Sequence, residues 1–319
     1  MKRTARCAAV LLLIFVLPLK SLASELLVPV GEVIGLRLLC GSVTVAALDD
    51  VLGAEAKKAG LCPGDEILAV DGTPVERAED IRNAIRDRER VALTVQRGSR
   101  RMRLELPVHG TQDGPRLGIS LREGICGIGT VTWYDPETGR FGALGHGVSD
   151  SSGTLAPMRG GNAYKAGVIS VKKGTAGHPG QLRGSAQEEP FGELIKNTPQ
   201  GICAVSSVPF AGKALPTAGY EEIKSGQAKI LSTVTGNGPR EYSVEIEKIY
   251  PQDRPDGRNF LLRVTDEELL KTTGGIVQGM SGSPIIQDGK LVGAVTHVLV
   301  NDPTRGYGIF IENMLDAAG

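Results

Sequence analysis

Near its C-terminus the chain reads GMSGSP at residues 279–284, between the glycine-rich segment 274–278 and the apolar run 285–286. Small residues on both sides of Ser281 let the backbone turn sharply, so the serine hydroxyl is presented as a nucleophile. The N–H groups of Gly279 and Ser281 can then point at one spot and stabilise a developing oxyanion. An ordinary β-turn between two strands is the alternative, because glycine, serine and proline also gather in such turns.

A serine nucleophile needs a general base, and the sequence offers four histidines. His146 lies between two glycines at the end of an expected strand, where its ring is uncrowded and can face a cleft. His109 and His178 lie in polar connectors and are interpreted as loop residues. His297 falls in an expected strand at 291–298, where it either lines the cleft or is a hydrogen-bonded core histidine.

The third member of such a site is a carboxylate that orients the base, and two aspartates compete for this role. Asp150 follows His146 by four residues, which along an extended chain is about 13 Å, so a turn would have to bring it back. Asp266 closes an alternating strand pattern fifteen residues before Ser281. We favour Asp266.

The stretch 259–315, together with the segment GALGH at 142–146, resembles the SpoIVB-type serine peptidases of endospore-forming bacteria, peptidase family S55. The resemblance implies a chymotrypsin-like double β-barrel with a catalytic triad in the chain order His, Asp, Ser. In this sequence the triad falls on His146, Asp266 and Ser281. Ordinary chymotrypsin-like enzymes carry the aspartate much further ahead of the serine, which sets this chain apart from them.

The composition favours a mainly β protein. Of 319 residues, 43 are glycine, 41% are hydrophobic and only 4% are aromatic, as expected for many short strands joined by tight turns. The 36 basic residues are balanced by 36 acidic ones, which gives no electrostatic reason to expect a nucleic acid as partner.

The N-terminus has the pattern of a secretory signal. Basic residues precede an apolar run of thirteen residues at 7–19, and a small-residue stretch follows at 21–23. The run is shorter than the roughly 20 residues that span a bilayer. We therefore interpret residues 1–23 as a signal peptide, with a retained membrane anchor as the alternative. The four later cysteines are read either as two disulfides or as buried free thiols: Cys40, Cys62, Cys126 and Cys203.

A compact α+β module precedes the protease region. Within 56–75 the pattern predicts a short helix that ends at Gly60, a turn at 63–64 and a strand at 66–70. This segment strongly resembles the PDZ domains of bacterial proteases, so we expect a PDZ domain over residues 27–108.

A PDZ domain binds an extended peptide as an added strand, with backbone amides that receive a terminal carboxylate. The alternative is a β-module whose groove is empty or filled by the protein's own chain. We expect a linker at 109–115 and the peptidase domain at 116–319. The walls of its specificity pocket are expected at 295–297 and 304–308. The groove residues that we expect are Val33, Ile34, Gly35, Leu36, Leu38, Ile81 and Ile85.

The resemblance also implies a role. Family members are translocated serine endopeptidases that cleave a regulatory membrane-protein partner during intercompartmental sporulation signalling, in the intermembrane space of the developing spore, and they also cleave themselves. Self-cleavage is expected between Ala23 and the PDZ domain. Serine chemistry needs no cofactor and no metal, so none is expected. A broad quality-control protease of the cell envelope and a catalytically inactive PDZ adaptor are the alternatives.

Overall fold

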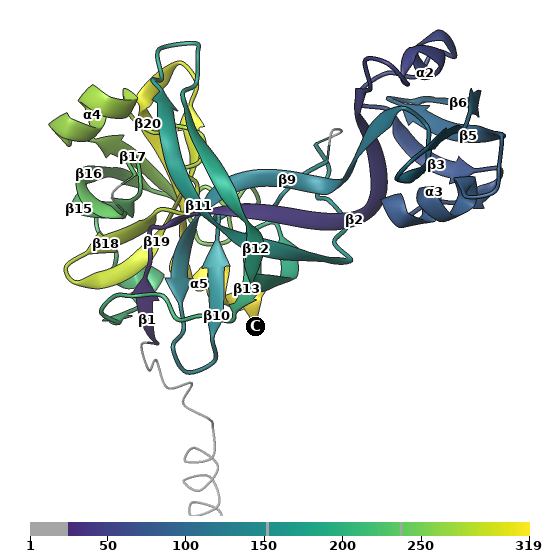
Figure 1. Ribbon diagram of the computed structural model, residues 1–319. Coiled ribbons are helices and arrows are strands. Elements are labelled where there is room, and N and C mark those ends of the chain that lie inside the picture. The colour runs from purple at the N-terminus through teal and green to yellow at the C-terminus, as the bar shows by residue number, and fades with distance from the viewer. Residues whose placement is uncertain (1–24, 151–152, 237) are drawn as a thin grey trace, which may run out of the picture.

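The computed structural model describes residues 25–150, 153–236 and 238–319, and its architecture is dominated by strands (Figure 1). The predicted signal peptide or anchor at 1–23 lies outside the described residues. Among the described residues, the structure contains no helix with the length and apolar character needed to cross a bilayer.

The first barrel is a ring of six strands. Neighbours pair in the order β9, β10, β13, β12, β11 and β2, and pairing between β2 and β9 closes the ring. Two short strands lie beside the ring: β1 pairs with β9, and β14 pairs with β1. The strands of this region are β1 (Leu26–Pro29), β2 (Val33–Leu48), β9 (Ile119–Tyr134), β10 (Arg140–Ala143), β11 (Gly160–Lys172), β12 (Gln181–Thr198), β13 (Gly201–Ser206) and β14 (Leu215–Pro216).

The second barrel is also closed and has six strands, in the order β15, β16, β17, β20, β19 and β18. Its strands are β15 (Gly226–Ser232), β16 (Arg240–Ile249), β17 (Phe260–Val264), β18 (Pro284–Gln287), β19 (Lys290–Leu299) and β20 (Asp302–Phe310). Three helical segments accompany them: the 3₁₀ helix η1 (Tyr220–Glu222), α4 (Glu267–Thr273) and α5 (Ile311–Ala318).

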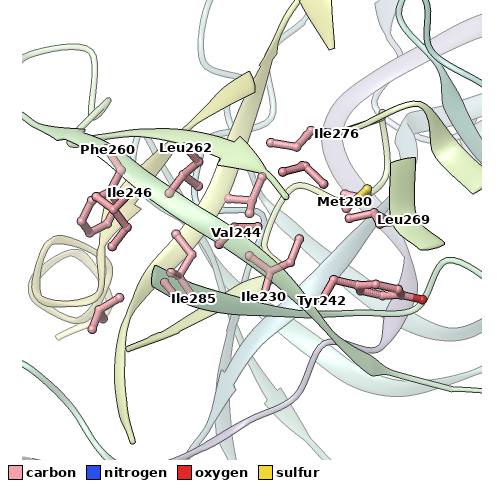
Figure 2. Packing of buried hydrophobic residues seen from close by; sticks show 14 of the residues in the cluster. Ile230, Tyr242, Val244, Ile246, Phe260, Leu262, Leu269, Ile276, Met280 and Ile285 are labelled. Atoms are coloured by element: carbon pink, nitrogen blue, oxygen red, sulfur yellow. The ribbon is translucent and has the colours of Figure 1, made fainter. Parts of the chain in front are cut away.

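The core of the second barrel follows from strand alternation. In β16 every second side chain from Tyr242 to Ile246 is buried, so one face of the strand points inward. Figure 2 shows these side chains packed with those of β15, β17 and β18. Met280 belongs to the same cluster and lies beside Leu269 and Ile276. The residue next to Ser281 is therefore anchored in the barrel core.

Strands β2 and β9 continue beyond the first barrel as a two-stranded ribbon, and the PDZ domain is built on its far end (Figure 1). A separate apolar cluster that includes Val43, Val45 and Ile81 forms the core of this domain. Its remaining elements are α2 (Ala54–Lys58), β3 (Glu66–Val70), β4 (Thr73–Pro74), α3 (Ala78–Ile85), β5 (Arg90–Arg97), β6 (Arg100–Pro107), β7 (His109–Thr111) and β8 (Gly114–Arg116).

The expected fold class, a PDZ domain with a chymotrypsin-like double β-barrel, is confirmed, but the expected boundaries need correction. Residues 33–39 pair with β9 and β11 inside the first barrel, so they are not part of the PDZ domain. The segment 109–115, expected as a linker, contains the paired strands β7 and β8. The chain thus begins the barrel, leaves it to form the PDZ domain, and returns along β9.

Candidate active site

Ser281 lies on a tight turn directly before β18. Gly279 and Gly282 have φ angles of +100° and +96°, in the left-handed region that favours glycine. A Cβ atom on Gly282 would lie 2.0 Å from the carbonyl oxygen of Thr130 and 2.6 Å from the backbone nitrogen of Leu144. The turn therefore requires glycine at 282, and it packs directly on the first barrel.

Two buried threonines of β9 hold this turn. The Thr130 hydroxyl donates to the Gly279 carbonyl at 2.8 Å, and the Thr132 hydroxyl donates to the Gly282 carbonyl at 2.8 Å. The Thr130 N–H also donates to the Ser281 carbonyl at 2.9 Å. Both threonines are fully buried, so these bonds satisfy hydroxyls that would otherwise be costly to bury. Sequence reasoning missed them, although threonine at alternate positions of an apolar strand was a visible signal.

The backbone amides of the turn are free to bind an acceptor. Within the described part of the chain, neither the Gly279 N–H nor the Ser281 N–H donates a hydrogen bond. Buried backbone donors are normally paired, so two unused donors in one turn are unusual. This is the arrangement that the predicted oxyanion hole requires.

His146 follows a sharp reversal at the end of β10. Leu144 and Gly145 both have left-handed φ angles, +72° and +68°. A Cβ atom on Gly145 would lie 3.0 Å from the Thr296 methyl carbon, so the glycine lets this segment approach β19 closely. The reversal brings His146 beside His297, with the two ring centroids 5.0 Å apart.

The His146 ring is held in the tautomer that a general base needs. Its Nδ1 lies 2.9 Å from the Gly147 carbonyl oxygen. Because a carbonyl only accepts, Nδ1 carries the proton and Nε2 is left as the acceptor. Burial lowers the pKa of His146 from its usual 6.5, and the bond to Gly147 opposes this shift only in part.

Ser281 and His146 line the same cavity, which has a volume of about 520 Å³. The Ser281 hydroxyl donates to the Thr296 carbonyl oxygen at 2.6 Å rather than to His146. No hydrogen bond joins the Ser281 hydroxyl to the His146 ring in the described part of the chain. The structure brings the predicted nucleophile and base into one site, in a resting arrangement.

His297 also lines this cavity, as the cleft reading of the sequence anticipated. Burial, the nearby His146 and then Arg258 lower its pKa from 6.5 to about 4, so the ring is neutral at neutral pH. Its Nδ1 is buried and has no hydrogen-bond partner among the described residues.

Asp266 is placed in a different role from the one we predicted. It is the N-cap of α4: its carboxylate accepts the Leu269 N–H at 2.9 Å and the Ser243 N–H at 3.3 Å. It is not among the residues that line the catalytic cavity, and no contact joins it to His146. The geometry that a triad needs is thus absent between these two side chains in this arrangement.

The remaining sequence candidates lie outside the cavity. The Asp150 carboxylate accepts the N–H of Thr154. His109 is in β7, and His178 is exposed in the loop between β11 and β12. Among the described residues that line the cavity there is no carboxylate, and none of these candidates is present. The four cysteines expected as disulfides or thiols are free, and only Cys203 is buried.

A second hollow, of about 1,010 Å³, lies in the PDZ domain between α3 and the first residues of β9. Ile81 and Ile85 of α3 line it, as predicted, and Leu117 and Ile119 face them. Between these two, Gly118 has a φ of +67°, and a Cβ atom there would lie 2.2 Å from the Leu52 carbonyl oxygen. This tight turn, directly before an edge strand, is where a peptide could be added to the sheet.

The other predicted groove residues do not belong to this hollow. Ile34 and Leu38 are buried in the core of the first barrel, and Val33 is buried in the core of the second. Gly35 pairs with Tyr164 of β11, while Leu36 and Leu38 line the catalytic cavity. The prediction placed residues 33–38 beside the helix, but they pair inside the first barrel, and the strand that lines the hollow with α3 is β9, which comes after the helix in the chain.

The sequence was also compared with known families. The family described as SpoIVB peptidase S55 matches residues 113–315, well over half of the chain. The chain belongs to this family. A PDZ domain model matches residues 53–97, inside the domain carried by the ribbon.

Two curated relatives resemble a smaller part of this S55 peptidase. They are described as putative zinc metalloproteases of Rhizobium meliloti (strain 1021) and Agrobacterium fabrum, and each is 32% identical, over 100 and 98 residues respectively. The matches cover 31% and 30% of this chain but only 26% and 25% of the relatives. The chain thus spans about a quarter of the length of the curated relatives that it matches.

Solved structures show distant similarity. The HtrA-type protease AlgW with a tripeptide matches 60% of this chain and 54% of its own, at 12% identity and a TM-score of 0.36. The active form of the Rv3671c protease from M. tuberculosis matches 61% and 75%, at 16% identity and a TM-score of 0.37. The PDZ domain of an SdrC-like protein from Listeria monocytogenes matches 25% and 85%, at 21% identity and a TM-score of 0.22. The strand pairings above, not these scores, define the fold of the S55 peptidase.

Proposed function

We propose that this protein is a serine endopeptidase in which Ser281 is the nucleophile and His146 the general base. The observation that carries the proposal is the shared cavity, which Ser281, His146 and Gly279 line; among the described residues, the N–H groups of Gly279 and Ser281 donate no hydrogen bond. Each of these groups has a defined part in peptide-bond hydrolysis.

In the first half-reaction Ser281 Oγ forms a bond to the carbonyl carbon of the substrate, and His146 Nε2 takes the hydroxyl proton. The carbonyl oxygen becomes an oxyanion that accepts the Gly279 and Ser281 N–H groups. The C–N bond then breaks, and the proton on His146 passes to the leaving amine. In the second half-reaction a water molecule attacks the acyl carbon and gives a proton to His146 Nε2. The C–O bond to Ser281 then breaks, His146 returns the proton to Ser281 Oγ, and the acid product leaves.

Asp266 completes the proposed triad by analogy with the family order His, Asp, Ser. What supports this assignment is the position of the residue in the chain, whereas its side chain caps α4. Direct participation therefore requires the start of α4 to rearrange when the substrate binds. The bond from His146 Nδ1 to the Gly147 carbonyl already fixes the tautomer in the resting arrangement.

The PDZ hollow is proposed to bind an extended segment of a protein partner beside the edge strand that starts at Ile119. Ile81 and Ile85 supply apolar contacts, and the turn at Gly118 supplies backbone amides. The ribbon of β2 and β9 then connects this hollow to the catalytic cavity, since Leu38 and Ile125 line the cavity on the same two strands.

We further propose the biological role that the family description supports. The enzyme is translocated across a membrane through residues 1–23, which are removed or retained as an anchor. In the intermembrane space of a developing spore, or outside the cytoplasm, it cleaves a membrane-associated regulatory protein in sporulation signalling. It also cleaves itself near Ala23, ahead of β1, because residues from Leu26 onward are paired in the first barrel.

The proposal is tested with the Ser281→Ala variant of the full chain. Loss of turnover on the order of 10⁴ to 10⁶ is expected, with the free energy of unfolding unchanged. A fluorophosphonate probe should label the wild-type protein at Ser281 and leave the variant unlabelled. Cleavage that persists in a purified variant would reject Ser281 as the nucleophile, and failure of the probe to label the wild type would favour an inactive adaptor.

Asp266 is tested separately, because its capping role and its triad role have different signatures. Asp266→Ala removes the N-cap and is expected to lower the free energy of unfolding by about 1 kcal/mol, whereas Asp266→Asn keeps a capping oxygen and costs less. The measurement is urea unfolding together with kcat for each variant. If the stable Asn variant loses turnover, the carboxylate acts in the triad; if it keeps turnover, Asp266 is only a cap.

A further inference from the structure

The walls of the catalytic cavity are apolar on both sides of Ser281. Ile276, Val277 and Val298, from the second barrel and the loop before β18, line one part of it, and Leu36 and Ile128 of the first barrel line another. No lysine, arginine, aspartate or glutamate is among the described residues that line the cavity.

Both groups of side chains lie close to the turn that carries Ser281. Ile276 and Val277 belong to the same loop as Gly279, three and two residues ahead of it. From β9, the Ile128 side chain lies 3.2 Å from the point where a Cβ atom of Gly279 would be. A substrate whose carbonyl sits at the Gly279 amide therefore presents its neighbouring side chains to these walls.

The two histidines in the cavity do not supply a charge at neutral pH. Burial lowers the pKa of His146, and it lowers the pKa of His297 to about 4. A charged substrate side chain would lose water in this cavity without gaining an ionic partner, which is unfavourable. An aliphatic side chain would gain from leaving water.

This inference rests on the proposed function. We infer that the enzyme selects polypeptide segments with aliphatic side chains next to the scissile bond and rejects segments with charged side chains there. The walls of Ile276, Val277 and Val298 on one side, and of Leu36 and Ile128 on the other, determine this specificity.

The first experiment uses the full-length wild-type chain and a series of internally quenched peptides that differ only in the residue before the scissile bond: Leu, Val, Ala, Lys or Asp. We expect kcat/KM for Leu to exceed that for Ala by roughly 10- to 200-fold, as for apolar pockets generally. The Lys and Asp peptides should be cleaved more slowly still. Fluorophosphonate labelling of Ser281 is followed in the same preparation as an independent measure of the nucleophile.

A second experiment changes the wall. Val298 is half-buried in the cavity, whereas Val300 lies two residues further along, is 49% exposed, and is outside the cavity lining. Val298→Asp should raise the ratio of Lys to Leu cleavage at least about tenfold, because it places a carboxylate in the wall. Val300→Asp adds the same charge outside the cavity and should leave the ratio unchanged.

The outcomes separate the two proposals. Equal cleavage of Leu, Lys and Asp peptides by a protein that the probe labels normally would overturn the specificity and leave the serine peptidase intact. Absence of both labelling and cleavage would overturn the peptidase, and the specificity with it. If Val298→Asp does not fold, the wild-type series alone still decides, because the predicted preference for Leu over Ala, Lys and Asp does not depend on the variant.

Discussion

The catalytic cavity and the PDZ hollow both lie along β2 and β9, but they are held together by different forces. At the cavity, buried hydroxyls of Thr130 and Thr132 bind the nucleophile turn, and glycine at 282 lets the two barrels touch. At the hollow, exposed or half-exposed ion pairs connect the PDZ domain to its surroundings, among them Arg37 with Glu123.

The difference has an energetic meaning. Buried, satisfied hydrogen bonds and close backbone contacts tolerate little displacement, so the cavity is preorganised for chemistry that depends on exact positions. Surface ion pairs contribute little and are screened by salt, so the hollow can adjust to a partner. The same ribbon thus joins a rigid chemical site to a more adaptable recognition site.

The largest effect is expected where the two barrels touch. Gly282→Ala places a Cβ atom within 2.0 Å of the Thr130 carbonyl oxygen, in a left-handed backbone conformation. Gly289→Ala is the matched control, because Gly289 has a φ of +77° but nothing within 4 Å of its Cβ position. In both variants the strained backbone conformation should lower the free energy of unfolding by about 1–2 kcal/mol. In Gly282→Ala overpacking should lower it by about 1–3 kcal/mol more.

The two variants should also differ in turnover. Because Gly282 adjoins Ser281, its displacement should lower kcat by roughly 10²-fold, whereas Gly289→Ala should leave kcat near the wild-type value. Urea unfolding and peptide cleavage measure the two effects. Equal losses in the two variants would mean that the nucleophile turn relaxes easily and that the cavity is not preorganised.

The turns that carry Ser281 and His146 were largely predictable from the sequence because they are encoded locally. Glycines around Ser281 and around His146 specify turns, and a turn can be read from adjacent residues. The partners that hold these turns could not be predicted in the same way. The contact of Thr130 with Gly279 spans 149 residues, and no local pattern shows which buried threonine meets which carbonyl.

Asp266 and the PDZ groove show the opposite case. Asp266 has the place in chain order of a triad residue, but it is also a good N-cap for the helix that starts at Glu267, and the local role prevails in the structure. In the PDZ domain the helix and the turn at Gly60 were predictable. The strand that lines the hollow with α3 could not be predicted. It pairs through Ile119 with Leu48, and most of the PDZ domain lies between these two residues in the chain.

A smaller effect is expected from the pH dependence of stability. The pKa of His297 is about 4 in the folded protein and near 6.5 when the chain is unfolded. Below pH 6.5 the unfolded chain therefore binds a proton that the folded protein resists, so this histidine destabilises the fold as the pH falls from 6.5 towards 4. His297→Gln should remove that part of the pH dependence.

The comparison is made by urea unfolding of the wild type, His297→Gln and the control His178→Gln at several pH values between 7.5 and 4.5. The wild type and the control should lose more stability across this range than His297→Gln. The nearby groups whose charges also act on His297 are His146, Arg258 and Asp256, and they are unchanged in all three proteins. If the free energy of unfolding changed with pH in the same way in all three proteins, the His297 ring would not be desolvated in the cavity.

The smallest effect is expected at the recognition site. Arg159, which follows the His146 loop, pairs with Glu76 at the start of α3, and both side chains are more than half exposed. Arg159→Ala should therefore change the free energy of unfolding by less than about 1 kcal/mol and leave cleavage of short peptides intact. If Arg159→Ala lowered the free energy of unfolding as much as Gly282→Ala does, the PDZ domain would be held to the barrel as firmly as the nucleophile turn is. The contrast between a rigid cavity and an adaptable hollow would then be lost, because charge pairing at the surface would be holding the two sites in one fixed arrangement.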